Sequence, residues 1–313
     1  MKFIISLTTI FLLTASTIVL AQNKKNERKI IDTHFHCLTW NSFGTPPPPN
    51  EITGILPKAK SNNEEQSIML EALKKNHIVK AITSGRPNRM DEYKVADSNR
   101  IIEGLLIENE KELPDTSAFI QTIKDGKLKV FGELGLVYFG KTLNDPMFEP
   151  YLSICERFNI PVSLHTGISF PNTPYECCPK FRTYLGNPQL MEDVLVMHPK
   201  LKVQLMHMGY PYLEETKAIL NVYPQVNVDV AVVDWRIPTT EFYNYLKALI
   251  DAGLEKRIMY GSDEMIWTDA LDLSIKNIEN APFLNEEQKQ DIFYNNAAKF
   301  FNIQQQLNEL CWL

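Results

Sequence analysis

Four of the six histidines and two carboxylates lie at the ends of apolar runs. His34 and His36 are separated by one residue in IIDTHFHCLTW. In an extended strand alternate side chains point to the same side, so both imidazoles face one way. Two neutral nitrogen donors on one face are half of a metal site. The other candidates for the site end later runs: Glu133, His165, His207 and Asp263.

The apolar runs that carry these residues are rich in Val, Ile and Leu, which is typical of parallel strands covered on both sides. Segments with helical periodicity lie between them. Eight such alternations predict a single-domain α/β fold, a (β/α)8 TIM barrel over residues 30–303, with a doubly wound open sheet as the alternative. The predicted strands are 29–34, 79–84, 100–107, 128–134, 160–165, 201–207, 226–233 and 257–263. The predicted helices include 64–76, 145–159, 187–198, 212–223, 240–253 and 285–303.

A barrel brings the carboxyl ends of its strands to one mouth, so the six candidate ligands are expected to meet there. The connections 38–63 and 166–186 are long and follow strands, so they are expected to rise over the same face. His77 and His198 precede strands, which places them at the opposite face with structural roles.

The ends of the chain and its composition bear on location and partners. Residues 1–21 have one early lysine, an apolar stretch and small residues before Gln22, the pattern of a cleavable signal peptide. An uncleaved membrane anchor is the alternative. We expect a polar tether at 22–29, a C-terminal tail at 304–313 and an exported, periplasmic or secreted protein.

The net charge of −6, or −7 without Lys2, argues against nucleic acid as a partner.

The five cysteines form no C-x-x-C pair. In a chain of this length we expect them to be free thiols used as small apolar residues. The alternative is one bridge, from Cys37 to Cys177 or Cys178, since both segments border the predicted mouth.

DTHFH, SLHTG, LMHMG and YGSD, followed by a closing helix with NNAAKFF, resemble the amidohydrolase superfamily. The similarity spans residues 30 to about 302. The branch it resembles is the amidohydrolase-related (amidohydrolase 2) metal-dependent hydrolases of TIM-barrel fold, which also includes decarboxylases and lactonases. The stretch FRTYLGNPQLMEDVLVMHPKLKVQLMHMGYP adds specificity for that branch.

The resemblance implies that His34, His36, His165 and Asp263 bind a divalent metal. In mononuclear members the histidine that matches His207 lies beside the metal-bound water, whereas in binuclear members it binds a second metal. Glu133 stands where binuclear members have a bridging ligand, so one or two ions remain open. Nitrogen and carboxylate donors favour Zn, with Mn, Fe or Co as alternatives.

These parts predict cleavage of an ester, lactone or amide of a small molecule by a metal-activated water. Asp263 would be the general base, and His207 would orient the water or polarise the carbonyl. Arg86 and Arg182 are candidates to bind a substrate carboxylate. Residues expected to wall the pocket are Tyr210, Trp235, Arg236 and Trp267.

Three alternatives stay open at this point. The same branch contains non-oxidative decarboxylases with similar ligands. GELG also resembles TatD-like nucleases, although the negative net charge of the chain argues against a nucleic-acid substrate. A metal-dependent binding protein without turnover is the third, although it would not require a base at Asp263. Oligomeric state is open as well, with a homo-oligomer as one outcome.

Overall fold

Eight parallel strands form two sheets in a computed structural model that describes residues 28–303. The first sheet has the order β1-β2-β3 and the second β4-β5-β6-β7-β8. Every predicted strand has an observed counterpart, although most are shorter than the apolar runs. The strands are β1 (Ile30–Cys37), β2 (Ile78–Gly85), β3 (Ile101–Glu103), β4 (Phe131–Leu134), β5 (Val162–Leu164), β6 (Val203–Leu205), β7 (Val226–Asp229) and β8 (Ile258–Met259).

Backbone contacts join the two sheets at both edges. On one side, parallel bridges pair Gly104 with Val130 and Ile107 with Leu134. On the other, Phe35 of β1 pairs with Glu264 beyond β8. The eight strands therefore follow one another around a closed ring, as expected for a (β/α)8 barrel.

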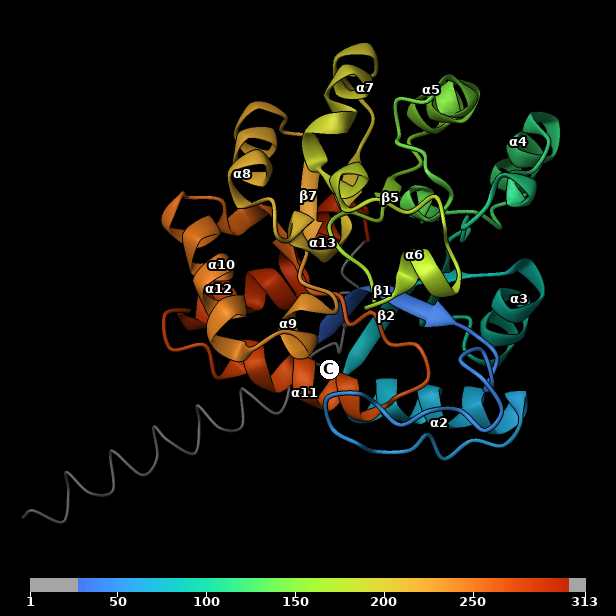
Figure 1. Cartoon of the computed structure of the whole chain (residues 1–313), viewed down its shortest axis with the longest axis vertical. Coiled ribbons are helices and arrows are strands. Elements are labelled where there is room, and N and C mark those ends of the chain that lie inside the picture. Colours follow the sequence, from blue (N-terminus) through green and yellow to red (C-terminus); the bar gives the residue numbers. More distant parts are fainter. Residues whose placement is uncertain (1–27, 304–313) are drawn as a thin grey trace, which may run out of the picture.

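Helices surround the strands as an outer layer (Figure 1). Apolar residues on the inner face of each helix pack against the strands, and the shared core extends through most of the chain. The larger helices are α2 (Asn62–Lys75), α3 (Pro87–Ala96), α4 (Thr116–Lys124), α5 (Glu149–Phe158), α7 (Glu192–Met197), α8 (Leu213–Val222), α10 (Thr239–Asp251) and α11 (Asp269–Glu279). Two shorter ones, α6 (Thr173–Glu176) and α9 (Val233–Arg236), lie in connections after β5 and β7.

The predicted C-terminal helix is present but is not a regular α-helix. Asn285 caps its start, and its side chain and that of Gln288 form a reciprocal capping box. The segment continues as α12 (Glu286–Gln290), a π-helical turn (Asp291–Asn295) and α13 (Asn296–Phe300). Ile292 of the turn accepts a backbone hydrogen bond from Tyr260 at 2.7 Å, which ties this segment to the end of β8.

The connection between β1 and α2 is long, as predicted, and reaches α11 (Figure 1). Trp267 donates its indole N–H to the Pro48 carbonyl at 3.0 Å, and Thr53 bonds Asp269. Within residues 28–303, no helix has the length and apolar content needed to cross a bilayer. The predicted signal peptide, most of the tether and the C-terminal tail lie outside the described residues.

Candidate metal centre

The six predicted ligands meet at the carboxyl ends of the strands. All are buried, with exposures of 0 to 6%. Three trios have donor atoms within 4.8 Å of one another, which is close enough to share a metal ion. They are His34, His207 and Asp263; His34, His36 and Glu133; and Glu133, His165 and His207.

Glu133 occupies the centre of this cluster and divides it. Its Oε2 lies 3.3 Å from Nε2 of His34 and 3.2 Å from Nε2 of His36. Its Oε1 lies 2.6 Å from Nδ1 of His165 and 3.7 Å from Nε2 of His207. The two oxygens of one carboxylate thus face two different histidine pairs.

Glu133 reaches this position because β4 approaches β5 closely at Gly132. A Cβ at Gly132 would lie 2.4 Å from the carbonyl oxygen of Ser163, so only glycine fits there. The backbone N–H of Glu133 donates to the Ser84 hydroxyl at 2.8 Å, which ties it to β2 as well.

Asp263 stands beside the first histidine pair. Its Oδ1 lies 2.9 Å from Nε2 of His36 and 3.4 Å from Nε2 of His34. The buried carboxylate of Asp32 supports this side of the cluster, because it accepts hydrogen bonds from the backbone N–H groups of His34 and Ser262, both at 3.0 Å. Asp32 therefore joins the end of β1 to the segment that carries Asp263.

His207 faces the cluster through one nitrogen only. Its Nδ1 lies 3.1 Å from the carbonyl oxygen of Ala231, which can only accept a hydrogen bond, so Nδ1 carries the proton. Nε2 then presents its lone pair to the cluster, 3.0 Å from Nδ1 of His165. This tautomer suits a metal ligand.

Asp229, at the end of β7, is a functional residue that the sequence did not reveal. It is fully buried, and its Oδ1 accepts hydrogen bonds from the backbone N–H groups of His207 and Ala231, both at 3.0 Å. Its Oδ2 accepts from the Gln204 amide at 2.5 Å. His207 has a left-handed φ of 62°, so these bonds hold a backbone turn that is unfavourable for a β-branched or bulky residue.

The sequence did not identify Asp229 as a strand-end residue, because its apolar run continues as VAVV and predicted a strand to residue 233. The strand ends at Asp229 itself. A shorter predicted strand would have put this aspartate in the set of strand-end residues.

Tyr138 is a second residue at the site that the sequence did not reveal. It lies in the turn after β4, with its hydroxyl 3.4 Å from Nε2 of His165, the nitrogen that faces away from Glu133. The Ser169 hydroxyl donates to the Tyr138 oxygen at 3.3 Å. Tyr138 therefore contacts the outer side of a candidate ligand, where no spacing rule in the sequence points to it.

Electrostatics in the cluster favour positive charge. Burial acts to lower the pKa of His36, but hydrogen bonds and charges from Asp263 and Glu133 outweigh it and raise the pKa to about 9. The pKa of His34 is raised well above its ordinary value by the same carboxylates, against the effect of burial. Burial would raise the pKa of Glu133, yet His34, His165 and His207 hold it well below the usual range. Such a pocket is suited to a divalent cation.

The two predicted substrate arginines already have other partners. Arg86, more than half exposed, pairs with Glu112 and lies 3.4 Å from Glu108. Arg182 is exposed and donates to the carbonyls of Pro179 and Phe181 in its own loop. The structure therefore does not bring either side chain into the metal cluster, and their contact with substrate stays a prediction.

The alternative of a bridge from Cys37 is wrong, and so is the expectation of free thiols at Cys177 and Cys178. Cys177 and Cys178 are joined to each other, whereas Cys37 and Cys155 are free and buried, as expected for small apolar residues. Cys37 lies beside Gly85 of β2, and the alternation of side chains along β1 directs it to the face opposite His34 and His36. Cys311 lies outside the described residues.

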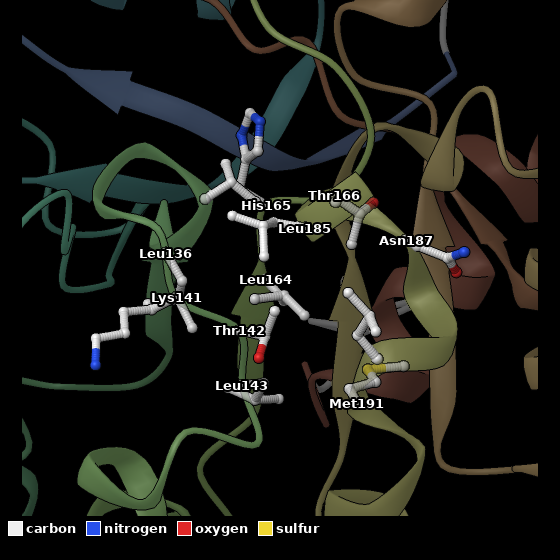
Figure 2. A pocket seen from close by; sticks show the side chains of 13 residues that line it. Leu136, Lys141, Thr142, Leu143, Leu164, His165, Thr166, Leu185, Asn187 and Met191 are labelled. Atoms are coloured by element: carbon white, nitrogen blue, oxygen red, sulfur yellow. The ribbon is translucent and has the colours of Figure 1, made fainter. Parts of the chain in front are cut away.

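The remaining histidines lie away from the cluster. His77 directly precedes β2 and is exposed, and His198 is placed between Glu149 and Glu156 of α5 at 3.0 and 3.2 Å. A small cavity of about 10 Å³ next to His165 has room for about one water molecule. Figure 2 shows Leu143, Leu164 and Met191 on one side of His165, which is the one candidate ligand among the residues that line this cavity.

The chain is similar in sequence to a known protein family. Residues 31–303 match the amidohydrolase family. The chain belongs to the amidohydrolase family. It is thus an enzyme of the metal-dependent amidohydrolase type, and proteins of similar fold include a decarboxylase and a putative metal-dependent hydrolase. One curated relative of this amidohydrolase, the protein fluG of Emericella nidulans, is 22% identical over 186 residues. The match covers 53% of this chain but only 21% of that relative.

Solved structures share the fold of this amidohydrolase at low sequence identity. An uncharacterised TIM-barrel protein from Bordetella bronchiseptica is 19% identical, with a TM-score of 0.67 and coverage of 88% of this chain and 98% of that one. A probable 2-pyrone-4,6-dicarboxylic acid hydrolase from Acinetobacter baumannii, with citric acid bound, is 15% identical with a TM-score of 0.58, covering 88% and 99%. The 5-carboxyvanillate decarboxylase of Novosphingobium aromaticivorans, complexed with manganese, is 14% identical with a TM-score of 0.59, covering 90% and 97%.

Proposed function

We propose that this amidohydrolase is an exported hydrolase that cleaves an ester, lactone or amide bond in a small organic acid. The observation that carries the proposal is the position of Glu133 between the pair His34 and His36 and the pair His165 and His207. A carboxylate with one oxygen toward each histidine pair is suited to bridge two ions. We therefore propose two divalent metals, with Zn or Mn as candidates.

The donors fit such ions in number and in type. His34, His36 and Asp263 would hold one ion, and His165 and His207 the other, with Glu133 shared. Both pairs consist of imidazoles with a carboxylate between them, the mixture that Zn and other first-row metals accept. When bound, divalent ions would lower the pKa of a water molecule and polarise a substrate carbonyl.

Residues of the chain supply the proton transfers and the orientation. Asp263 is the carboxylate at the mouth that would accept the proton of the attacking water and pass it to the leaving group. Its pKa is held below the usual range by His34 and His36, against the effect of burial, so it is ionised and able to accept. The Tyr138 hydroxyl would keep the His165 ring in place.

A decarboxylase is the second candidate, favoured by the likeness to a structure of 5-carboxyvanillate decarboxylase. That likeness is in fold alone, and the donors described here serve either reaction. A nuclease is not favoured, because the chain is acidic.

Metal analysis followed by turnover assays tests the proposal. The purified protein is expected to hold two equivalents of metal and to release protons from one or more members of a lactone and ester panel. Release of carbon dioxide from aromatic acids would instead assign the decarboxylase. Full metal occupancy without either reaction would contradict both and favour a binding protein.

The Glu133→Gln variant separates one ion from two. It removes the shared charge but keeps the size of the side chain, so metal content is expected to fall from two equivalents to one. Glu103→Gln is the matched control, because Glu103 also ends a strand, β3, but pairs with Lys94 at 3.1 Å. Two equivalents retained in Glu133→Gln would contradict the bridging role.

A further inference from the structure

Arg236, which was predicted to wall the pocket but not to bind a carboxylate, is held where three loops meet above the barrel. Arg236 ends α9, and its guanidinium carbon lies 4.3 Å from the ring centre of Phe170, in the loop after β5. Its Nη2 donates to both carboxylate oxygens of Glu51, at 3.2 and 3.3 Å, in the loop after β1. The carboxyl ends of strands β1, β5 and β7 all lie at the cluster of candidate ligands, so the loops that follow these strands border the same mouth.

The segment that carries Arg236 also contacts the cluster directly. At its start, the Ala231 carbonyl lies 3.1 Å from Nδ1 of His207. At its end, Trp235 donates its indole N–H at 2.8 Å to the carbonyl of Ser262, the neighbour of Asp263. Residues 231–236 therefore lead from the candidate ligands to Arg236 within one short stretch of chain.

Arg236 is incompletely paired by Glu51. Both contacts come from the single nitrogen Nη2, while Nε is buried and has no hydrogen-bond partner among residues 28–303. The Arg236 side chain is only 14% exposed, whereas that of Glu51 is 45% exposed. A guanidinium presents its N–H groups as a planar fork that matches both oxygens of a carboxylate, so a carboxylate that displaces Glu51 could bond both Nε and Nη2, whereas Glu51 bonds Nη2 alone.

Three aromatic rings follow one another from this arginine. Phe43 lies 6.4 Å from Phe170 and 4.8 Å from Trp267, measured between ring centres. Arg236 stacks on the same Phe170 ring. A planar, unsaturated ligand that carries a carboxylate would match both the rings and the guanidinium.

We propose that Arg236 binds a carboxylate of the substrate and that Glu51 occupies this arginine until the substrate displaces it. The inference rests on the proposed function, because it assumes that the substrate enters at this mouth. It narrows the substrate to a planar organic acid with a carboxylate in addition to the group that reacts. Arg86 and Arg182 are less suited to this role, since their guanidinium groups are exposed and bonded to other partners.

Binding of two probe acids to the metal-loaded protein tests this assignment by calorimetry. Benzoate has one carboxylate, which the metal alone can bind, whereas isophthalate has a second on the same flat ring. The protein is expected to bind isophthalate more tightly than benzoate by roughly tenfold or more, the effect of a charge-assisted pair. In Arg236→Gln the two acids should bind equally.

The Glu51→Gln variant is expected to change isophthalate binding in the opposite direction. Because it removes the competing carboxylate, it should tighten isophthalate binding several-fold and leave benzoate unchanged. Weaker isophthalate binding in this variant would show that the pair serves only to hold the loops, which would overturn the displacement by substrate. Arg157→Gln is the matched control, since Arg157 also stacks on a phenylalanine, at 4.7 Å from the Phe158 ring, but on α5.

The outcomes separate this inference from the proposed function. Equal binding of the two acids by the unaltered protein, or a preference that survives in Arg236→Gln, overturns the role of Arg236. Metal content is measured in each variant, so a protein without metal contradicts the proposed function instead. If Arg236→Gln retains its metal but no longer binds isophthalate more tightly than benzoate, the role of Arg236 in binding the carboxylate is supported.

Discussion

Asp229 and His34 face each other beneath the metal cluster, with Oδ2 of the carboxylate 3.5 Å from Nδ1 of the imidazole. Nε2 of the same ring faces Glu133 and Asp263. Asp229 also holds the backbone of His207, so one buried carboxylate positions candidate ligands from two strands. Outer partners of this kind fix the orientation and basicity of metal-binding histidines.

Asp229→Asn is expected to weaken metal binding by roughly 10- to 100-fold. The amide keeps one oxygen for the backbone but turns an N–H₂ group toward Gln204 and His34, where an acceptor is needed. Metal affinity is measured by competition with a chelator. The control is Asp234→Asn, because that carboxyl is fully buried as well but accepts a hydrogen bond from Ser274 and not from a candidate ligand. Equal affinities in the two variants would contradict the role of Asp229.

Asp263→Asn is expected to lower turnover by roughly 100- to 10,000-fold, because the amide cannot accept the proton of the attacking water. The amide oxygen still faces His36, so most of the metal should stay bound. Turnover and metal content are measured on the same sample. Unchanged turnover with metal bound would show that another group is the base.

Removal of metal is expected to lower the thermal unfolding midpoint. A metal that binds only the folded protein and is present at 1,000 times its dissociation constant stabilises the folded state by about 4 kcal/mol. For a domain of this size the shift is on the order of 10 °C. Calorimetry before dialysis against a chelator, after it, and after return of Zn or Mn measures the effect. A midpoint that does not move would argue that no metal is bound by the native cluster.

Glu65 is expected to make stability depend on pH. Burial raises its pKa from 4.5 to about 7, against the effects of Tyr93 and Arg89. Between these values the folded state holds a proton that the unfolded state has lost, so the free energy of unfolding falls as pH rises from 4.5 to 7, by at most about 1.4 kcal/mol per pH unit.

Chemical denaturation across this range compares the protein with Glu65→Gln, which has no proton to lose. The difference in unfolding free energy should shift in favour of the variant as pH rises. Glu71→Gln, exposed on the same helix, is the control and should parallel the unaltered protein. A constant difference between Glu65→Gln and the unaltered protein would contradict the pKa shift.

Local patterns in the chain were sufficient for the strands and the six candidate ligands. Apolar runs identify strands because both faces of a parallel sheet are buried, and a barrel requires the ends of these strands to meet. This reasoning joined His34 to Asp263 across more than 200 residues of sequence. It failed at Asp229, where hydrophobic residues continue past the end of the strand, and at Cys177 and Cys178, which were expected to be free thiols but are joined to each other.

The sequence by itself determined the fold class and which residues form the candidate metal centre, because period and residue type depend on local chemistry. Only the tertiary structure decided that Glu133 separates two histidine pairs, that His207 presents Nε2, and that Arg236 has a buried donor without a partner. These features depend on distances between loops that are remote in sequence. Each is set by packing and by hydrogen bonds that exist only once the barrel has closed.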